Sequence, residues 1–123
     1  MTPVIDFSAP TESRSERRLA DLADRVREGD PRHVTEGRYE SADGRLIAGT
    51  WRSTPGRWRA FEGREEFCTL LSGRVRLIPE GGAAQEFGPG QSFLIPAGFR
   101  GEWEVLETAV KHYVVRLQPE ESR

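Results

Sequence analysis

The side chains best suited to nucleophilic, acid–base or metal chemistry are few in this sequence. It contains one cysteine (Cys68), one lysine (Lys111) and two histidines (His33 and His112). One cysteine excludes an internal disulfide and zinc sites built from two or four cysteines, and two histidines exclude every site that needs three. The other 17 basic residues are arginines. Lysine can form a Schiff base or transfer a proton at a lowered pKa, which arginine cannot, so Lys111 is a candidate for chemistry.

Each of these side chains also has an ordinary structural explanation. A lone lysine is more often half-exposed on a strand. A lone cysteine in mid-strand is more often core packing, because a reactive thiolate needs an accessible, electropositive setting. His112 alternates with Val110 and Val114 on one face of an expected strand, and Lys111 and Tyr113 share the other face. The apolar neighbours favour an inward-facing His112, where a lone histidine is usually a hydrogen-bonded core residue.

An amphipathic segment opens the chain. Its apolar residues recur at helical spacing between Thr11 and Gly29, at Leu19, Leu22, Ala23 and Val26. Ser13 and Glu16 have the spacing of a capping box, and Gly29 followed by Asp30-Pro31 is typical of a helix end. The sequence therefore predicts a short N-terminal α-helix packed outside a larger body. It divides into a helical lead (residues 1–31) and a barrel (residues 32–123).

The barrel region consists of short runs separated by turn signals such as Pro55-Gly56 and Pro89-Gly90. Strands are expected at His33–Tyr39, Leu46–Ser53, Arg57–Glu62, Glu66–Ser72, Arg74–Pro79, Gln85–Phe87, Ser92–Ile95, Gly101–Val105 and Val110–Leu117. Short strands at this spacing favour a sheet that closes into a sandwich or barrel. The predicted fold class is therefore all-β, a single barrel domain with a short N-terminal helix.

Length and charge limit the function classes. A chain of 123 residues fits one domain. Its arginines are interleaved with 20 acidic residues and the net charge is −2, so nucleic acid is not an expected partner. The first ten residues lack the basic and apolar segments of a signal peptide, and no apolar run reaches the ~20 residues that span a bilayer. We expect a cytoplasmic protein with no membrane contact.

Two segments resemble the signature motifs of the cupins, which are small jelly-roll barrels. Gly90, five residues and then Pro96-Ala97-Gly98 match the second motif. Glu66 and Gly73, separated by six residues, match the end of the first motif. The resemblance implies a cupin double-stranded β-helix. Because cupins commonly dimerise through sheet contacts, it also implies a homodimer.

A longer stretch, from Leu46 to Leu117, resembles the ureidoglycine aminohydrolase-like cupins, a subgroup of mostly uncharacterised proteins. The matching positions include Trp51, Glu66-Phe67-Cys68, Pro96-Ala97-Gly98-Phe99, Gly101, Trp103, Glu107, Lys111 and Tyr113. The enzyme that gives the subgroup its name has two cupin domains and a metal, whereas this chain has length for one domain. The resemblance implies a small polar ligand, a carboxylate or a ureido compound.

The chain departs from the family at the metal site. Most metal-binding cupins use three histidines and one glutamate. Here only Glu66 stands at such a position, and the others fall on Gly101 and within Arg59–Glu62. One carboxylate does not hold a transition metal tightly, because such ions need three or four ligands. The hypothesis is a protein without a metal or other cofactor. The alternative is an atypical divalent metal held by Glu62, Glu66 and His112.

Glu66 is the first candidate for the site, because a carboxylate inside a barrel is costly unless it is paired or protonated. It is either a ligand-binding or acid–base group, or half of a buried ion pair with an arginine or Lys111. The expected catalytic residues are Glu66 and Lys111. The expected ligand-binding residues are Glu66, Cys68, Trp103, His112, Tyr113 and Arg59, with Trp51, Trp58 and Phe61 at the pocket mouth and Arg57 and Arg76 as further anion-binding candidates.

Three functions remain open at this point. The first is a small-molecule-binding cupin without the usual metal centre. The second is an aminohydrolase- or isomerase-like enzyme that uses Glu66 and Lys111 as acid and base. The third is a non-enzymatic module whose helix and outer strands form a homodimer or a regulatory contact.

Overall fold

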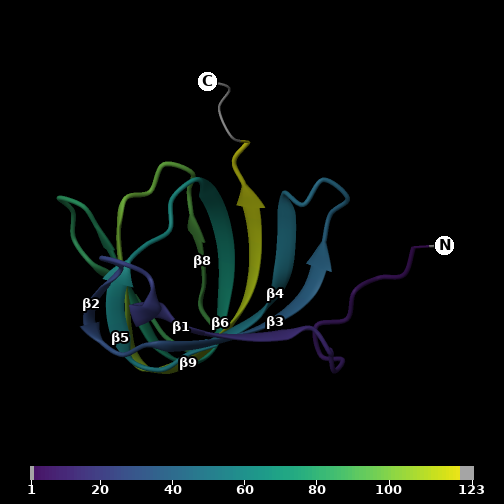
Figure 1. The fold of residues 1–123 in the computed structure, drawn as a ribbon, viewed down its shortest axis with the longest axis horizontal. Coiled ribbons are helices and arrows are strands. Elements are labelled where there is room, and N and C mark those ends of the chain that lie inside the picture. The colour runs from purple at the N-terminus through teal and green to yellow at the C-terminus, as the bar shows by residue number, and fades with distance from the viewer. Residues whose placement is uncertain (1, 120–123) are drawn as a thin grey trace.

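The chain forms one curled, antiparallel β-sheet (Figure 1), in a computed structural model that describes residues 2–119. The strands are β1 (Arg14–Arg18), β2 (Val26–Gly29), β3 (Arg32–Glu40), β4 (Leu46–Ser53), β5 (Gly56–Arg59), β6 (Arg64–Pro79), β7 (Gln85–Phe87), β8 (Ser92–Ile95) and β9 (Gly101–Leu117). The sheet runs in the order β1-β3-β4-β9-β5-β2, and β6 pairs with β7, β8 and β9. The predicted all-β jelly-roll fold is therefore confirmed.

The predicted N-terminal helix is wrong. Its residues form β1, which pairs with β3, and β2, which pairs with β5. The one helical segment among residues 2–119 is the 3-10 turn η1 (Leu19–Asp21). Of the apolar residues of the expected stripe, Leu19 is fully buried whereas Leu22 is 36% exposed, so they do not share one buried face. The open edges of β3 and β5 instead offer unpaired backbone groups, which β1 and β2 cover. No helix in the described part of the chain is long and apolar enough to cross a membrane.

The longest strands, β6 and β9, pair with each other along their length. The sequence predicted a break in each, but both are continuous, and the pairing shifts register between Leu70 and Val75. Gly73 lies in this stretch with a φ of +86°. A Cβ there would stand 2.3 Å from the carbonyl oxygen of Thr108, so only glycine allows this close approach. The turn signal at Gly73 marks a β-bulge inside one strand rather than a strand end.

Alternation along β6 and β9 determines which side chains face the interior. On β9, Lys111, Tyr113 and Val115 are buried, whereas Val114 between them is 38% exposed. On the first half of β6, Glu66, Cys68 and Leu70 are buried, whereas Phe67 between them is exposed. The inner faces of these two strands therefore bring Glu66 and Lys111 to the same side of the sheet.

Candidate functional site

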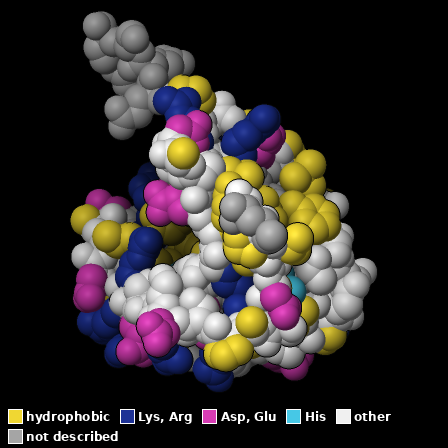
Figure 2. All heavy atoms as spheres, turned by 90° about the vertical axis from the view of Figure 1, so that its right-hand side faces the viewer, with side chains coloured by type: hydrophobic (Ala, Val, Ile, Leu, Met, Phe, Trp, Pro, Cys, Tyr) yellow, Lys and Arg dark blue, Asp and Glu magenta, His cyan; other side chains and the backbone are white. Residues whose placement is uncertain are grey.

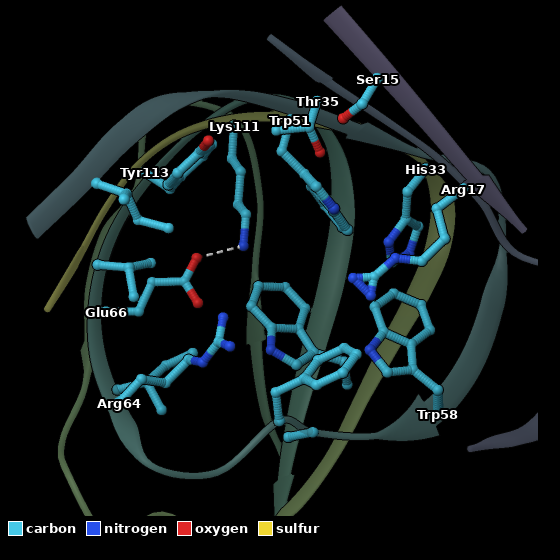
Figure 3. Close-up of a pocket in the computed structure, with 16 residues that line it drawn as sticks. Ser15, Arg17, His33, Thr35, Trp51, Trp58, Arg64, Glu66, Lys111 and Tyr113 are labelled. Atoms are coloured by element: carbon cyan, nitrogen blue, oxygen red, sulfur yellow. Dashed lines mark hydrogen bonds and ion pairs between the residues drawn. The ribbon is translucent and has the colours of Figure 1, made fainter. Parts of the chain in front are cut away.

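A pocket of about 370 Å³ occupies the interior of the curled sheet. Figure 3 shows side chains from several strands converging on it, and the space-filling view shows a hollow with basic side chains along its edge (Figure 2). The aromatic part of the lining is Trp51, Trp58, Phe61, Trp103 and Tyr113. The ionisable part is Arg17, His33, Arg64, Glu66 and Lys111. All three tryptophans of the chain thus line one cavity.

Glu66 and Lys111 form a buried ion pair on the pocket wall (Figure 3). The Nζ of Lys111 donates to Oε2 of Glu66 at 2.6 Å, and the two residues are 4% and 8% exposed, respectively. The ammonium also lies 4.1 Å from the ring centroid of Trp103 and 4.4 Å from that of Trp51. Two indole faces and a carboxylate therefore compensate the charge of Lys111 for its loss of water.

The surroundings keep the Lys111 ammonium charged. Burial alone lowers the pKa of Lys111, but the charge and the hydrogen bond of Glu66 raise it, and the pKa lies above its ordinary value. Burial raises the pKa of the Cys68 thiol far above its usual range. The thiol donates to Oε2 of Glu66 at 3.3 Å, and Cys68, which the sequence suggested as a ligand-binding residue, is buried and outside the pocket lining. At neutral pH the site thus contains an ammonium and a neutral thiol, and neither is a free nucleophile.

One oxygen of Glu66 remains for a ligand. Both contacts to the carboxylate, from Lys111 and from Cys68, use Oε2. Among residues 2–119, Oε1 has no hydrogen-bond partner, and it is not among the fully buried polar atoms that lack one. Oε1 is therefore an acceptor that can bind an N–H or O–H group in the pocket.

His33 enters the pocket from β3 and was missed as a site residue. Its ring packs edge-on against Trp51 and Trp58, with centroids 4.9 Å away in each case. Burial, together with the charges of Lys111 and Arg17, lowers the pKa of His33 to about 3, so the imidazole is neutral. Its Nε2 is buried and has no hydrogen-bond partner among the described residues. The ring is thus a neutral polar group directed into an aromatic wall.

Arg17 and Arg64 also line the pocket, although neither is among the site residues predicted from the sequence. Alternation from Glu66 back to Arg64 on β6 was a usable signal, because it places the two residues on one face. Arg17 had no such signal, because it lay in the segment predicted as a helix. It is opposite His33 in the β1–β3 register.

Several predicted site residues lie elsewhere. His112 is on the outer face, where its Nδ1 is 3.0 Å from Oγ1 of Thr50 and its ring meets Phe7 edge-on at 5.1 Å. Its apolar neighbours on β9 face outward with it, since the inward positions belong to Lys111 and Tyr113. Arg59 is exposed and outside the pocket lining. Arg57 and Arg76 pair with surface carboxylates instead: Arg57 with Glu28 and Glu102, and Arg76 with Glu86 and Glu104.

The residues present do not fit the metal centre that the family resemblance implies. Gly101, at a histidine position of the family, cannot carry a side chain, because a Cβ would lie 2.1 Å from the carbonyl oxygen of Ile78. Glu62 is on the surface and pairs with Arg100, away from Glu66. No group of three or more potential ligands gathers anywhere in residues 2–119. The alternative set of Glu62, Glu66 and His112 is therefore not brought together.

Comparisons with known proteins place these features in a family. Residues 40–113 match the model of the EutQ-like cupin domain. This match covers more than half of the chain and includes β4 to β8 and the part of β9 that carries Lys111. No curated protein matches the chain.

Solved structures share the fold at low sequence identity. A DUF861-family protein of unknown function from Pseudomonas syringae has a TM-score of 0.72 at 22% identity over 90% of this chain and 46% of its own. The EutQ protein of Clostridium difficile has a TM-score of 0.62 at 18% identity over 72% of this chain and 64% of its own. A DUF1255 protein of unknown function from Acidithiobacillus ferrooxidans has a TM-score of 0.59 at 24% identity, over 94% of this chain and 97% of its own. The chain thus spans less than two thirds of the first two proteins, and these likenesses show the fold.

Proposed function

The chain belongs to the EutQ-like cupin domain family, and we propose that it binds a small polar molecule inside the barrel, against the Glu66–Lys111 pair. The observation that carries this proposal is the placement of the pair. A buried ion pair forms part of the wall of a pocket of about 370 Å³, surrounded by three tryptophans. That volume is in the range of small-molecule sites, which combine apolar walls with a few polar groups.

The polar groups and the aromatic walls of the pocket indicate which chemical groups a ligand should carry. Oε1 of Glu66 accepts an N–H or O–H group, and the indole faces favour a flat or apolar body. A ureido compound fits this description, since its N–H groups donate to a carboxylate. This gives physical support to the resemblance to the ureidoglycine aminohydrolase-like subgroup, which remains part of the proposal.

A catalytic function is the second candidate. Glu66 is then the base and the Lys111 ammonium the acid of an aminohydrolase- or isomerase-like reaction, because the two side chains pair with each other and face the pocket. Schiff-base formation is disfavoured, since it requires the unprotonated amine. Turnover of a bound compound that is lost in Glu66→Gln, with the fold retained, would favour the enzyme over a binding protein.

We further infer a homodimer, formed through the outer face of β6, β8 and β9. Phe67, Leu94 and Val114 are cross-strand neighbours there, and they are 46%, 61% and 38% exposed. Adjacent exposed apolar side chains favour association of copies of the chain. A cytoplasmic location stays a prediction of the sequence.

Thermal unfolding with a panel of small acids, amides and ureido compounds tests the binding proposal. A compound that binds the folded state raises the melting temperature in proportion to its affinity. We expect one chemical class to stabilise the wild type and the effect to disappear in the double variant Glu66→Gln/Lys111→Met. The matched control is Glu65→Gln, on the same strand but paired with Arg116 outside the pocket. Equal stabilisation of the double variant would contradict the proposal.

A further inference from the structure

Two guanidinium groups in the pocket have no acidic partner within residues 2–119. Arg17 from β1 and Arg64 from β6 lie with their guanidinium carbons 5.2 and 5.4 Å from the ring centroid of Phe61. Figure 3 shows both side chains directed into the cavity, Arg64 beside Glu66 and Arg17 beside His33. Among residues 2–119, neither has a carboxylate oxygen within 4.0 Å, whereas Arg57 and Arg76 each contact two carboxylates.

Arg64 is the clearer case of an unfilled site. Its Nε is buried and has no hydrogen-bond partner in the described part of the chain. A buried donor without a partner costs free energy. The terminal nitrogens of Arg64 also lack a partner among residues 2–119 but are not fully buried, so they can donate to a ligand. The lining as a whole contains three cations, Arg17, Arg64 and Lys111, against the single carboxylate of Glu66. Because Glu66 already pairs with Lys111, the excess positive charge is concentrated at the two arginines.

We propose that Arg17 and Arg64 form an anion subsite beside Phe61, which binds the carboxylate of an organic acid whose other end reaches Glu66. This inference rests on the proposed binding function. It specifies that the ligand carries a negative charge at one end and a hydrogen-bond donor at the other. The planar fork of a guanidinium matches a carboxylate, and the Phe61 ring and the tryptophan walls suit a flat body between the two ends. The ligand class is therefore a flat monocarboxylic acid with a hydrogen-bond donor opposite the acid group.

A matched pair of probes separates the charge from the rest of the ligand. 4-Hydroxybenzoate has a carboxylate and a distal O–H donor on a flat ring, and 4-hydroxybenzamide replaces the anion by a neutral amide of the same shape. Calorimetric titration of the full chain with each probe is repeated for Arg17→Gln and Arg64→Gln. The control is Arg59→Gln, which removes an exposed arginine outside the pocket. Both pocket variants should fold, because neither side chain has an ion-pair partner in residues 2–119 to lose.

The expected result is a loss of affinity confined to the acid. Each pocket variant should weaken 4-hydroxybenzoate about tenfold and 4-hydroxybenzamide less than about twofold, and Arg59→Gln should change neither. Equal weakening of acid and amide, or an equal effect of Arg59→Gln, would overturn the anion subsite. If neither probe binds although the panel above contains a stabilising compound, the subsite inference fails alone. If the panel contains none either, the binding proposal fails with it.

Discussion

The ammonium of Lys111 lies 2.6 Å from Oε2 of Glu66, the one residue that the chain retains at a metal-ligand position of the cupin family. Two indole rings flank the ammonium, at 4.1 and 4.4 Å. Where the resemblance to metal-binding cupins implies a metal at this carboxylate, a side chain of the protein itself pairs with it. This arrangement makes the pair central both to stability and to ligand binding.

Removal of one partner should be far more damaging than removal of both. Lys111→Met leaves a buried carboxylate without its counter-charge, and we expect a loss of about 3–5 kcal/mol in the free energy of unfolding. The double variant Glu66→Gln/Lys111→Met removes both charges and should recover most of that loss. Urea denaturation of the wild type and of each single and double variant measures this coupling. Additive single and double effects would show that the two residues do not act as a pair.

His33 should make the protein less stable in mild acid. Its pKa is about 3 in the folded protein and 6.5 in its ordinary state, so the unfolded chain binds more protons between these values. Stability is therefore complete above pH 6.5 and is lost as the pH falls towards 3. The loss attributable to His33 between pH 7 and pH 5 is about 2 kcal/mol. His33→Phe keeps a ring between Trp51 and Trp58. It should flatten the slope of unfolding free energy against pH, so that the loss between pH 7 and pH 5 is smaller by that amount. An unchanged slope would place a charged or solvated imidazole at this position.

Gly101 should not tolerate a side chain. A Cβ at this position would lie 2.1 Å from the carbonyl oxygen of Ile78 and 2.9 Å from Cα of Pro79. Both neighbours are backbone atoms, so Gly101→Ala should destabilise the protein by more than ~2 kcal/mol. Gly37→Ala is the comparison, because its Cβ would meet only the side-chain oxygen of Ser13, at 3.2 Å. Thermal unfolding that ranks Gly37→Ala as the more damaging change would refute this expectation.

The outer face of β6, β8 and β9 should hold the dimer together. Light scattering coupled to size exclusion is expected to give a mass of twice the 13.9 kDa of one chain. Leu94→Lys introduces a charge at the most exposed residue of the apolar row and should shift the mass towards one chain. Val4→Lys, a change at an exposed apolar residue of the N-terminal segment, is the control. A wild type of single-chain mass would remove the homodimer from the proposal.

The strands were largely predictable, because turn signals and two-residue alternation are local properties of the sequence. The segment before Pro31 was wrongly predicted as a helix, because its structure depends on strands that are distant in the sequence. The spacing of its apolar residues fits a helix, but the segment pairs as β1 and β2 with the edges of β3 and β5, and these edges exist only once the sheet has folded. The same limit explains the fusion of strands at Gly73, since glycine there permits contact with Thr108, which is distant in sequence.

The candidate site was predictable in part. Glu66, Trp103 and Tyr113 line the pocket as expected, and the notion of an ion pair between Glu66 and Lys111 matches the structure. Arg17 was not predicted as a pocket residue, because it lies in the segment that was expected to form a helix outside the barrel. The inward direction expected of His112 followed from its valine neighbours, which face outward with it, and there Phe7 of the N-terminal segment packs against the His112 ring. Which face of a strand is interior depends on the closed sheet, and local apolarity does not determine it.

The most direct measurement of the central claim is a heteronuclear NMR titration that follows the indole Nε1–H signals of the three tryptophans, all of which line the pocket. The stabilising compound from the thermal panel should shift these signals in a saturable manner. In Glu66→Gln/Lys111→Met the same compound should cause little shift, and in Glu65→Gln the full one. Saturable binding that leaves all three indole signals unchanged would place the ligand outside the barrel and contradict the proposed function.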